Sequence, residues 1–200
     1  EANIAWANRY QSAGIRVILG VPGLKVHSKL CLISRTEGRK VRHYTAVGTG
    51  NFNEETAGLY TDHMLLTADP VMGRDAAKVF EYFGRSYRPP RLKKLVMAPF
   101  SLRQKVGELI DREIENAKAG KKASISIKIN NFSDPDTVFM LYRASQAGVK
   151  VRLIVRSMFS LVTDDPEISE NIRAISIVDG LLEHSRILRF SNCGDPVYYI

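Results

Sequence analysis

The sequence of 200 residues has few of the features that mark several large classes of protein. Its two cysteines, Cys31 and Cys193, are too few for a disulfide framework, and no Cys/His spacing is typical of a zinc site. No apolar run reaches the length of a membrane span, and no signal-peptide pattern opens the sequence. We therefore expect a globular protein of the reducing cytoplasm, with Cys31, which stands between Leu30 and Leu32, as a buried thiol.

Acidic residues are scarce in one part of the chain. Residues 1–100 hold 15 Lys and Arg against 8 Asp and Glu, whereas residues 101–200 hold 14 against 13. Between Arg16 and Arg42 there are seven basic residues and a single acid, Glu37. A local excess of cations of this kind concentrates anionic partners such as nucleotides, polyphosphate or nucleic acid. A solvated basic turn is the interpretation we prefer for residues 35–42 alone.

The periodicity of apolar residues predicts an α/β protein. Helices are expected at residues 2–13, from Asp69-Pro70 onward, after Ser101 and at residues 136–147. Strands are expected at residues 15–21, 25–33, 43–47, 124–129, 149–156, 172–178, 187–190 and 197–200. The proline- and cation-rich stretch of residues 84–99 separates two halves, which we predict to be domains 1–90 and 91–200.

The two halves resemble one another. AGIRV, residues 13–17, is matched by AGVKV, residues 147–151, and each glycine follows a predicted helix and precedes an apolar strand. His27-Ser28-Lys29 is matched by His184-Ser185-Arg186, and each group leads into an apolar strand. Two matches in the same order favour a divergent repeat, with two lobes that face each other.

His27 and Lys29 are the strongest catalytic candidates in the sequence. Residues i and i+2 of a strand share a face, so an imidazole and an ammonium would be presented together. A neutral imidazole is a nucleophile for phosphorus, and a cation stabilises the charged oxygens. In the second half, His184 is expected to act as a general acid or base beside Arg186. His43 and His63 carry no such pattern.

Other residues near these motifs fit either binding or plain structure. The loop Gly48-Thr49-Gly50-Asn51 follows a strand and could offer N–H groups, Thr49 and Asn51 to phosphate, or could simply be a turn. It is not a P-loop, because no Gly-Lys-Ser/Thr follows. Tyr60 fits a packed aromatic or a base-stacking platform. Arg156 fits a salt bridge or a phosphate clamp.

H-x-K followed by G-T-G-N, in two copies, resembles the phospholipase D superfamily. The phrases GLKVHSKLCLI, VGTGNFNEETAGLYTDH and NIRAISIVDGLLEHSRI are similar to the catalytic half of the bacterial polyphosphate kinase family. This resemblance runs through the whole sequence and implies two phospholipase D-like lobes, each a mixed sheet flanked by helices. It makes His27 the residue that is phosphorylated and His184 the second catalytic histidine, and it implies nucleotide contacts for Tyr60, Arg156 and His184.

The sequence departs from these patterns at several places. The phospholipase signature has Asp where Ser34 stands, and a histidine that some kinases use falls at Ala46. The magnesium-binding positions of the family would lie upstream of Glu1, so we expect no metal ligand within these residues. The second lobe's counterpart of the GTGN loop would follow Ile200. We therefore expect this chain to be an incomplete piece of a longer catalytic unit.

The resemblance implies a reversible kinase that transfers the γ-phosphate of ATP to polyphosphate and releases ADP, with Mg²⁺ as cofactor. It also implies a homo-oligomer of the full-length protein, ATP/ADP and polyphosphate as partners, and no nucleic acid. Peripheral association with the inner membrane stays open. Two alternatives are a phospholipase D-type phosphodiesterase or nuclease, which needs no ATP, and a non-catalytic polyanion-binding module.

Overall fold

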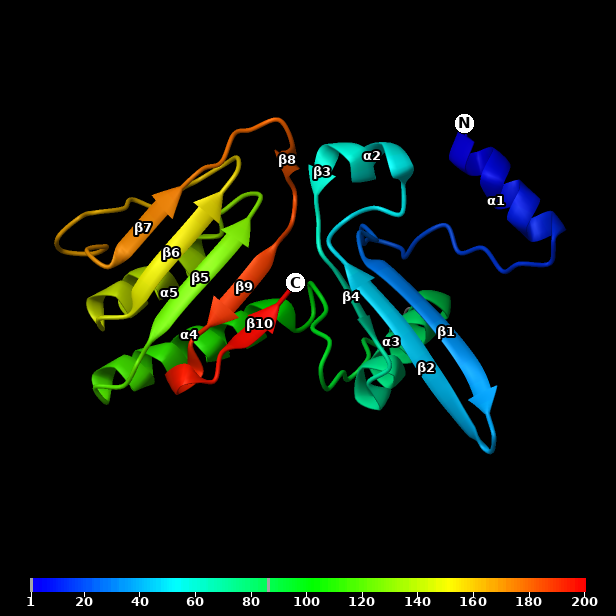
Figure 1. Ribbon diagram of the computed structural model, residues 1–200, viewed down its shortest axis with the longest axis horizontal. Coiled ribbons are helices and arrows are strands. Elements are labelled where there is room, and N and C mark those ends of the chain that lie inside the picture. The colour runs from blue at the N-terminus through cyan, green and yellow to red at the C-terminus, as the bar shows by residue number, and fades with distance from the viewer. Residues whose placement is uncertain (1, 86) are drawn as a thin grey trace.

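The computed structural model describes residues 2–85 and 87–200 and shows two α/β lobes side by side (Figure 1). The first lobe contains α1 (Ala2–Ser12), β1 (Lys29–Glu37), β2 (Lys40–Gly48), α2 (Glu54–Leu59), β3 (Tyr60–Thr61), β4 (Met64–Thr67) and α3 (Pro70–Gly84). The second contains α4 (Leu102–Lys118), β5 (Ser124–Ile129), α5 (Pro135–Gln146), β6 (Lys150–Val155), β7 (Ile172–Ile175), β8 (Leu182–Glu183), β9 (Ile187–Phe190), the 3₁₀ turn η1 (Asn192–Gly194) and β10 (Val197–Tyr199).

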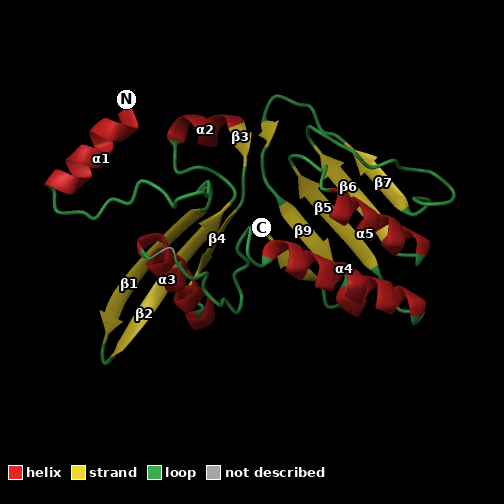
Figure 2. Cartoon of the chain, turned by 180° about the vertical axis from the view of Figure 1, so that it is seen from behind, coloured by secondary structure: helices red, strands yellow, loops and turns green. Residues whose placement is uncertain are grey.

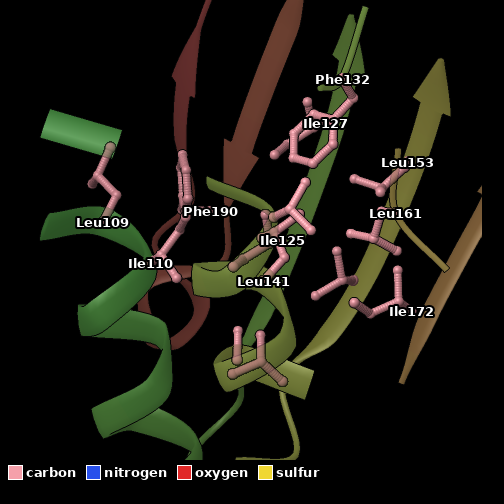
Figure 3. Close-up of a cluster of buried hydrophobic side chains, with 14 of the residues drawn as sticks. Leu109, Ile110, Ile125, Ile127, Phe132, Leu141, Leu153, Leu161, Ile172 and Phe190 are labelled. Carbon is pink, nitrogen blue, oxygen red and sulfur yellow. The ribbon is translucent and has the colours of Figure 1, made fainter. Parts of the chain in front are cut away.

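The second lobe is a mixed five-stranded sheet in the order β10-β9-β5-β6-β7, with α4 and α5 on one face (Figure 2). Strands β5, β6 and β7 are parallel, and β9 and β10 are antiparallel to their neighbours. Alternate residues of β5 and β6 point toward the helices. There they form one apolar core with Ile110 of α4, Leu141 of α5 and Phe190 of β9, all three fully buried (Figure 3).

The first lobe is built on a smaller, antiparallel sheet in the order β1-β2-β4. Helix α3 packs against β2 and begins at Pro70, with the Asp69 carboxylate capping the N–H groups of Val71 and Met72. An Asp cap followed by Pro is the pattern that predicts this helix start. Gly73 lets α3 approach β2 closely, because a Cβ at this position would lie 2.4 Å from the Cβ of His43.

Three expectations for the first lobe are wrong. Residues 15–20 form no strand, and Ile15, Ile18 and Leu19 are exposed, because no strand of the described residues lies alongside to accept their backbone hydrogen bonds. Strand β1 begins at Lys29, so His27 precedes it. Cys31 is exposed, because it points away from the face of the sheet that α3 covers.

The connection between the lobes is fastened to α3. The buried carboxylate of Asp75 accepts hydrogen bonds from the backbone N–H groups of Lys93, Lys94 and Leu95, at 2.8, 2.7 and 3.1 Å. The ammonium of Lys94 also donates to Asp69, at 2.7 Å. Three consecutive residues of the connection are therefore held by one helix of the first lobe.

Candidate active site

The two lobes meet through a short parallel pairing between β3 and β8 (Figure 1). Thr61 is paired with Glu183, and the N–H group of Ser185, two residues after Glu183, donates to the carbonyl of Thr61 at 2.9 Å. Residues some 120 positions apart in the sequence thus become neighbours. The pairing sets His184 directly opposite the end of β3.

His184 is held by the first lobe. Its Nδ1 lies 2.8 Å from Oδ1 of Asp62, and its ring centroid lies 4.9 Å from that of Tyr60. The imidazole is almost fully buried, at 9% exposure. A carboxylate that accepts from Nδ1–H fixes the ring's tautomer and orientation and leaves Nε2 for proton transfer. The histidine that the sequence analysis singled out is therefore in contact with a carboxylate of the other lobe.

The glycine-rich loop supports this carboxylate. The hydroxyl of Thr49 donates to Oδ1 of Asp62 at 2.6 Å and accepts from the N–H of His63 at 3.0 Å. The backbone N–H of Thr49 donates to the carbonyl of His63, also at 3.0 Å. Gly50 packs so tightly that a Cβ there would lie 2.6 Å from the Asp62 carboxylate. Thr49 and Gly50 thus position Asp62, and Asn51 beyond them is exposed.

His27 and Lys29 lie together even though His27 precedes the strand. The Lys29 ammonium is 3.1 and 3.2 Å from the two ring nitrogens of His27 and 2.8 Å from its carbonyl oxygen. Desolvation lowers the pKa of His27, and so do the charges of Lys29, Arg186, Lys25 and His184. A lowered pKa keeps the imidazole neutral, which is the nucleophilic form. Because the charges of Arg186 and His184 act on the pKa of His27, the second H-S-cation motif belongs to the same site.

Cations surround both imidazoles. Desolvation lowers the pKa of Lys29, and the charge of Arg186 lowers it further. Arg186 donates to the carbonyl of His184 at 3.4 Å. Arg156, just after β6, donates to Asn130 at 2.5 Å and to the carbonyl of Glu183 at 3.3 Å. The guanidinium of Arg156 is thus anchored beside the junction of the lobes, with part of its donor set left for a ligand.

Asp62 is the residue that the sequence analysis missed. It stands in Tyr60-Thr61-Asp62-His63, two positions after a residue that was singled out, but a lone Asp in a short polar stretch gives no periodic or spacing signal. Its partner His184 is 122 residues away, so only the fold pairs them. Lys128 and Glu183 form a second ionic contact at this junction, and the carboxylate of Glu183 also accepts from Thr61, at 3.1 Å.

No set of three or more His, Cys, Asp or Glu side chains suited to a metal ion occurs among residues 2–85 and 87–200. The Asp62 carboxylate is already engaged by His184 and Thr49. The side chains of residues 2–85 and 87–200 therefore do not fit a resident Mg²⁺ site.

Fold and site together define a class: a two-lobed α/β protein in which two imidazoles share a cationic site at the junction of the lobes. The family model for polyphosphate kinase C-terminal domain 1 matches residues 1–89, and that for polyphosphate kinase C-terminal domain 2 matches residues 95–200. The chain belongs to the polyphosphate kinase family and corresponds to part of its C-terminal region.

Individual relatives agree with this assignment. The chain is 50% identical to a polyphosphate kinase of Vibrio parahaemolyticus and 49% identical to one of Escherichia coli K12, in each case over its whole length. It spans 29% of the length of each of these relatives. The crystal structure of polyphosphate kinase from Porphyromonas gingivalis superposes with a TM-score of 0.88 over 99% of this chain and 33% of that one, at 39% identity.

Proposed function

We propose that the longer protein containing this chain is an ATP–polyphosphate phosphotransferase with His27 as its nucleophile. A neutral ring nitrogen of His27 attacks the γ-phosphorus of ATP, an N–P bond forms, the bond from that phosphorus to the bridging oxygen breaks, and ADP leaves. A terminal oxygen of polyphosphate then attacks the phosphorus of the phosphohistidine, a P–O bond forms, the N–P bond breaks to release the imidazole of His27, and the chain grows by one phosphate. Both steps are reversible, so the same site makes ATP from ADP and polyphosphate.

The cations have separate roles in this proposal. Lys29 and Arg186 stabilise the equatorial oxygens of the transferred phosphoryl group, since positioning and electrostatics supply most of the acceleration of phosphoryl transfer. Arg156, Tyr60 and Asn51 bind the nucleotide and its phosphates. Thr49 acts through Asp62, whose side chain it holds.

His184 is assigned proton transfer at the leaving or attacking oxygen. Its Nδ1 is engaged by Asp62, which leaves Nε2 as the nitrogen for proton transfer. The carboxylate also stabilises the imidazolium that forms when Nε2 takes a proton. The observation that carries the whole proposal is this Asp62–His184 contact, because it brings the second histidine into the cationic site around His27.

Further expectations belong to the longer protein. We propose that residues 1–90 and 91–200 contribute its two phospholipase D-like lobes, that Mg²⁺ arrives with the nucleotide, and that the full-length protein is a cytoplasmic homo-oligomer. The described residues contain no helix with both the length and the apolar character of a membrane span.

Labelling of the full-length protein with γ-³²P-ATP tests the nucleophile. We expect an acid-labile phosphoryl group that mass spectrometry maps to His27. His27→Ala should abolish it, whereas His184→Ala should slow its formation and turnover by roughly 10²–10⁴. His43→Gln is the matched control, because His43 packs against α3 and bonds to Ser34, away from the site. Acid-labile label that persists in His27→Ala would refute the assignment.

A further inference from the structure

The face of the five-stranded sheet that faces away from α4 and α5 carries a row of mostly cationic residues. The strand register pairs Arg173 with Arg152, Arg152 with Ser126, Ser126 with Arg189, and Arg189 with Tyr198. Residues that are directly paired across strands share a face. Figure 2 shows the two helices on the opposite face, so this row lies on the side that they leave uncovered.

A cavity of about 560 Å³ lies along the middle of this row, at the first residues of β5 and β6, and is lined by Arg152, Ser126 and Arg189 of the row. Five cationic side chains line it, and its lining contains no Asp or Glu. We call these residues the basic groove: Lys121, Lys122, Lys150, Arg152 and Arg189.

The charges of the groove are not neutralised within the part of the chain that the structure describes. None of the five forms a salt bridge with a described carboxylate, whereas Arg173, farther along the same row, is paired with Asp164 at 2.5 Å. Arg189 donates to the hydroxyl of Ser124 at 3.3 Å and lies over the ring of Tyr198 at 6.0 Å, both uncharged partners. Like charges held close together on rigid strands repel one another, and a bound anion would offset this repulsion.

The groove is distinct from the candidate active site. Lys128, near the last residue of β5, contacts Glu183 and Ser185 at the junction of the lobes, whereas Ser124, the first residue of β5, lines the groove. At about 3.3 Å per residue, the four residue steps from Ser124 to Lys128 separate the two by roughly 13 Å. A ligand that reaches both must be long.

We propose that the basic groove binds inorganic polyphosphate at phosphates remote from the reacting end. This inference rests on the proposed function, which supplies the chemical class of the ligand. The cavity lining itself contains no aromatic side chain, and the neighbouring Tyr198 ring lies against Arg189, so a nucleotide or single-stranded nucleic acid, which needs rings for its bases to stack on, is the poorer match. A flexible polyanion without bases needs cations alone, and the groove holds five within one cavity.

Direct binding of long-chain polyphosphate and of tripolyphosphate to the full-length protein tests the groove without any need for catalysis. Lys150→Gln combined with Arg152→Gln removes two cations of the groove. We expect the affinity for long chains to fall tenfold or more and the slope of log K against log salt to decrease by about two. Affinity for tripolyphosphate and labelling of His27 should not change, because the active site is untouched.

Arg39→Gln combined with Lys40→Gln is the matched control. It removes the same charge from the exposed tip of the β1–β2 hairpin, where Arg39 lies in the turn and Lys40 begins β2. Equal losses of affinity for long-chain polyphosphate in the two double variants would refute the groove proposal. Tight competition for the groove by single-stranded DNA of equal charge would also refute it. The two proposals can also fail separately. If the unaltered protein shows no label at His27 but still binds long chains, and the groove variant weakens that binding, the proposed function is refuted and the groove proposal is supported.

A measurement on the unaltered protein guards against a misfolded variant. Lysine acetylation followed by mass spectrometry should show Lys121, Lys122 and Lys150 protected by long-chain polyphosphate but not by tripolyphosphate. Lys40 should react equally under both conditions. Groove lysines that react at the same rate with and without long chains would contradict the proposal.

Discussion

His27 is the residue at which charge most directly sets chemistry. Desolvation and the cations Lys29, Arg186 and Lys25 lower its pKa from the ordinary histidine value of 6.5. A cation next to an imidazole disfavours the second positive charge, so the neutral form persists to lower pH. In the proposed mechanism, the same cations that lower this pKa also face the phosphate oxygens of the substrate.

This arrangement predicts the pH dependence of phosphoenzyme formation. The rate should decline as pH falls through the pKa of His27, with a midpoint below 6.5. Lys29→Met removes one source of the lowered pKa, so its midpoint should move upward, toward the ordinary value, whatever happens to the maximal rate. Rapid-quench labelling over a pH series measures the midpoint. A midpoint that is unchanged or lower in Lys29→Met would contradict this explanation.

Gly50 is the residue where sterics matter most. A Cβ at this position would meet the Asp62 carboxylate at 2.6 Å, so Gly50→Ala must displace Asp62 and, through it, His184. We expect a large drop in kcat, about 10²-fold or more, since small misplacements of catalytic groups carry costs of that size. Gly58→Ala in α2, where a Cβ meets nothing within 4 Å, is the control and should keep full activity. Equal activities of the two variants, from steady-state kinetics of the full-length protein, would disprove the positioning role.

At the scale of elements, the connection between the lobes behaves as part of α3. Asp75 accepts from three consecutive backbone N–H groups, and the ammonium of Lys78 donates to the carbonyl of Arg91 at 3.0 Å. These contacts fix where α4 starts relative to α3. They also limit how far the lobes can move apart around the β3–β8 pairing.

Asp75→Ala should loosen this connection. It leaves three N–H groups without their charged acceptor, and we expect a loss of about 1–3 kcal/mol of unfolding free energy, with Asp75→Asn recovering part of it. Spin labels on the exposed Cys31 and Cys193, one in each lobe, should show a broader distance distribution in Asp75→Ala. Asp111→Ala, which removes an exposed salt bridge to Arg143, should lose less than about 1 kcal/mol and keep the distribution narrow. A narrow distribution in Asp75→Ala would argue against a clamp.

At the scale of the whole molecule, buried apolar side chains are unevenly distributed. The core cluster runs from Leu109 to Phe190 and lies entirely in the second lobe, while Ile15, Ile33 and Leu66 of the first lobe are exposed. Local stability follows burial and backbone protection. The sheet of the second lobe should therefore be the most stable part of this chain.

Native-state hydrogen exchange of the 200-residue chain tests this distribution. Amides of β5 and β6 should exchange more slowly than those of the edge strand β1. Phe190→Ala removes a fully buried ring and should cost about 3–5 kcal/mol, with faster exchange in β5, β6 and β9 and little change in β1 and β2. Exchange that accelerates equally in both sheets would show instead that the lobes unfold as one unit.

Local patterns predicted much of the fold. SISIKI alternates strictly and forms β5, and Asp69-Pro70 marks the start of α3. The repeated AG motif also holds locally, since Gly14 and Gly148 both adopt positive φ, at 77° and 88°, after a helix. The strands expected after these glycines diverge. Residues 150–155 become β6 between two partners, while residues 15–20 form no strand, because a strand needs neighbours that local sequence does not reveal.

What the sequence determined by itself was the chemistry available and most of the elements: paired H-S-cation motifs, a glycine-rich loop, a local excess of cations, and periodicities that depend on near neighbours alone. The tertiary structure decided which of these groups meet. It joined Asp62 to His184 across 122 residues and turned Thr49 inward to hold Asp62. Contacts between distant segments follow from strand pairing and lobe packing, in which many weak interactions act together, so no short stretch of sequence contains them.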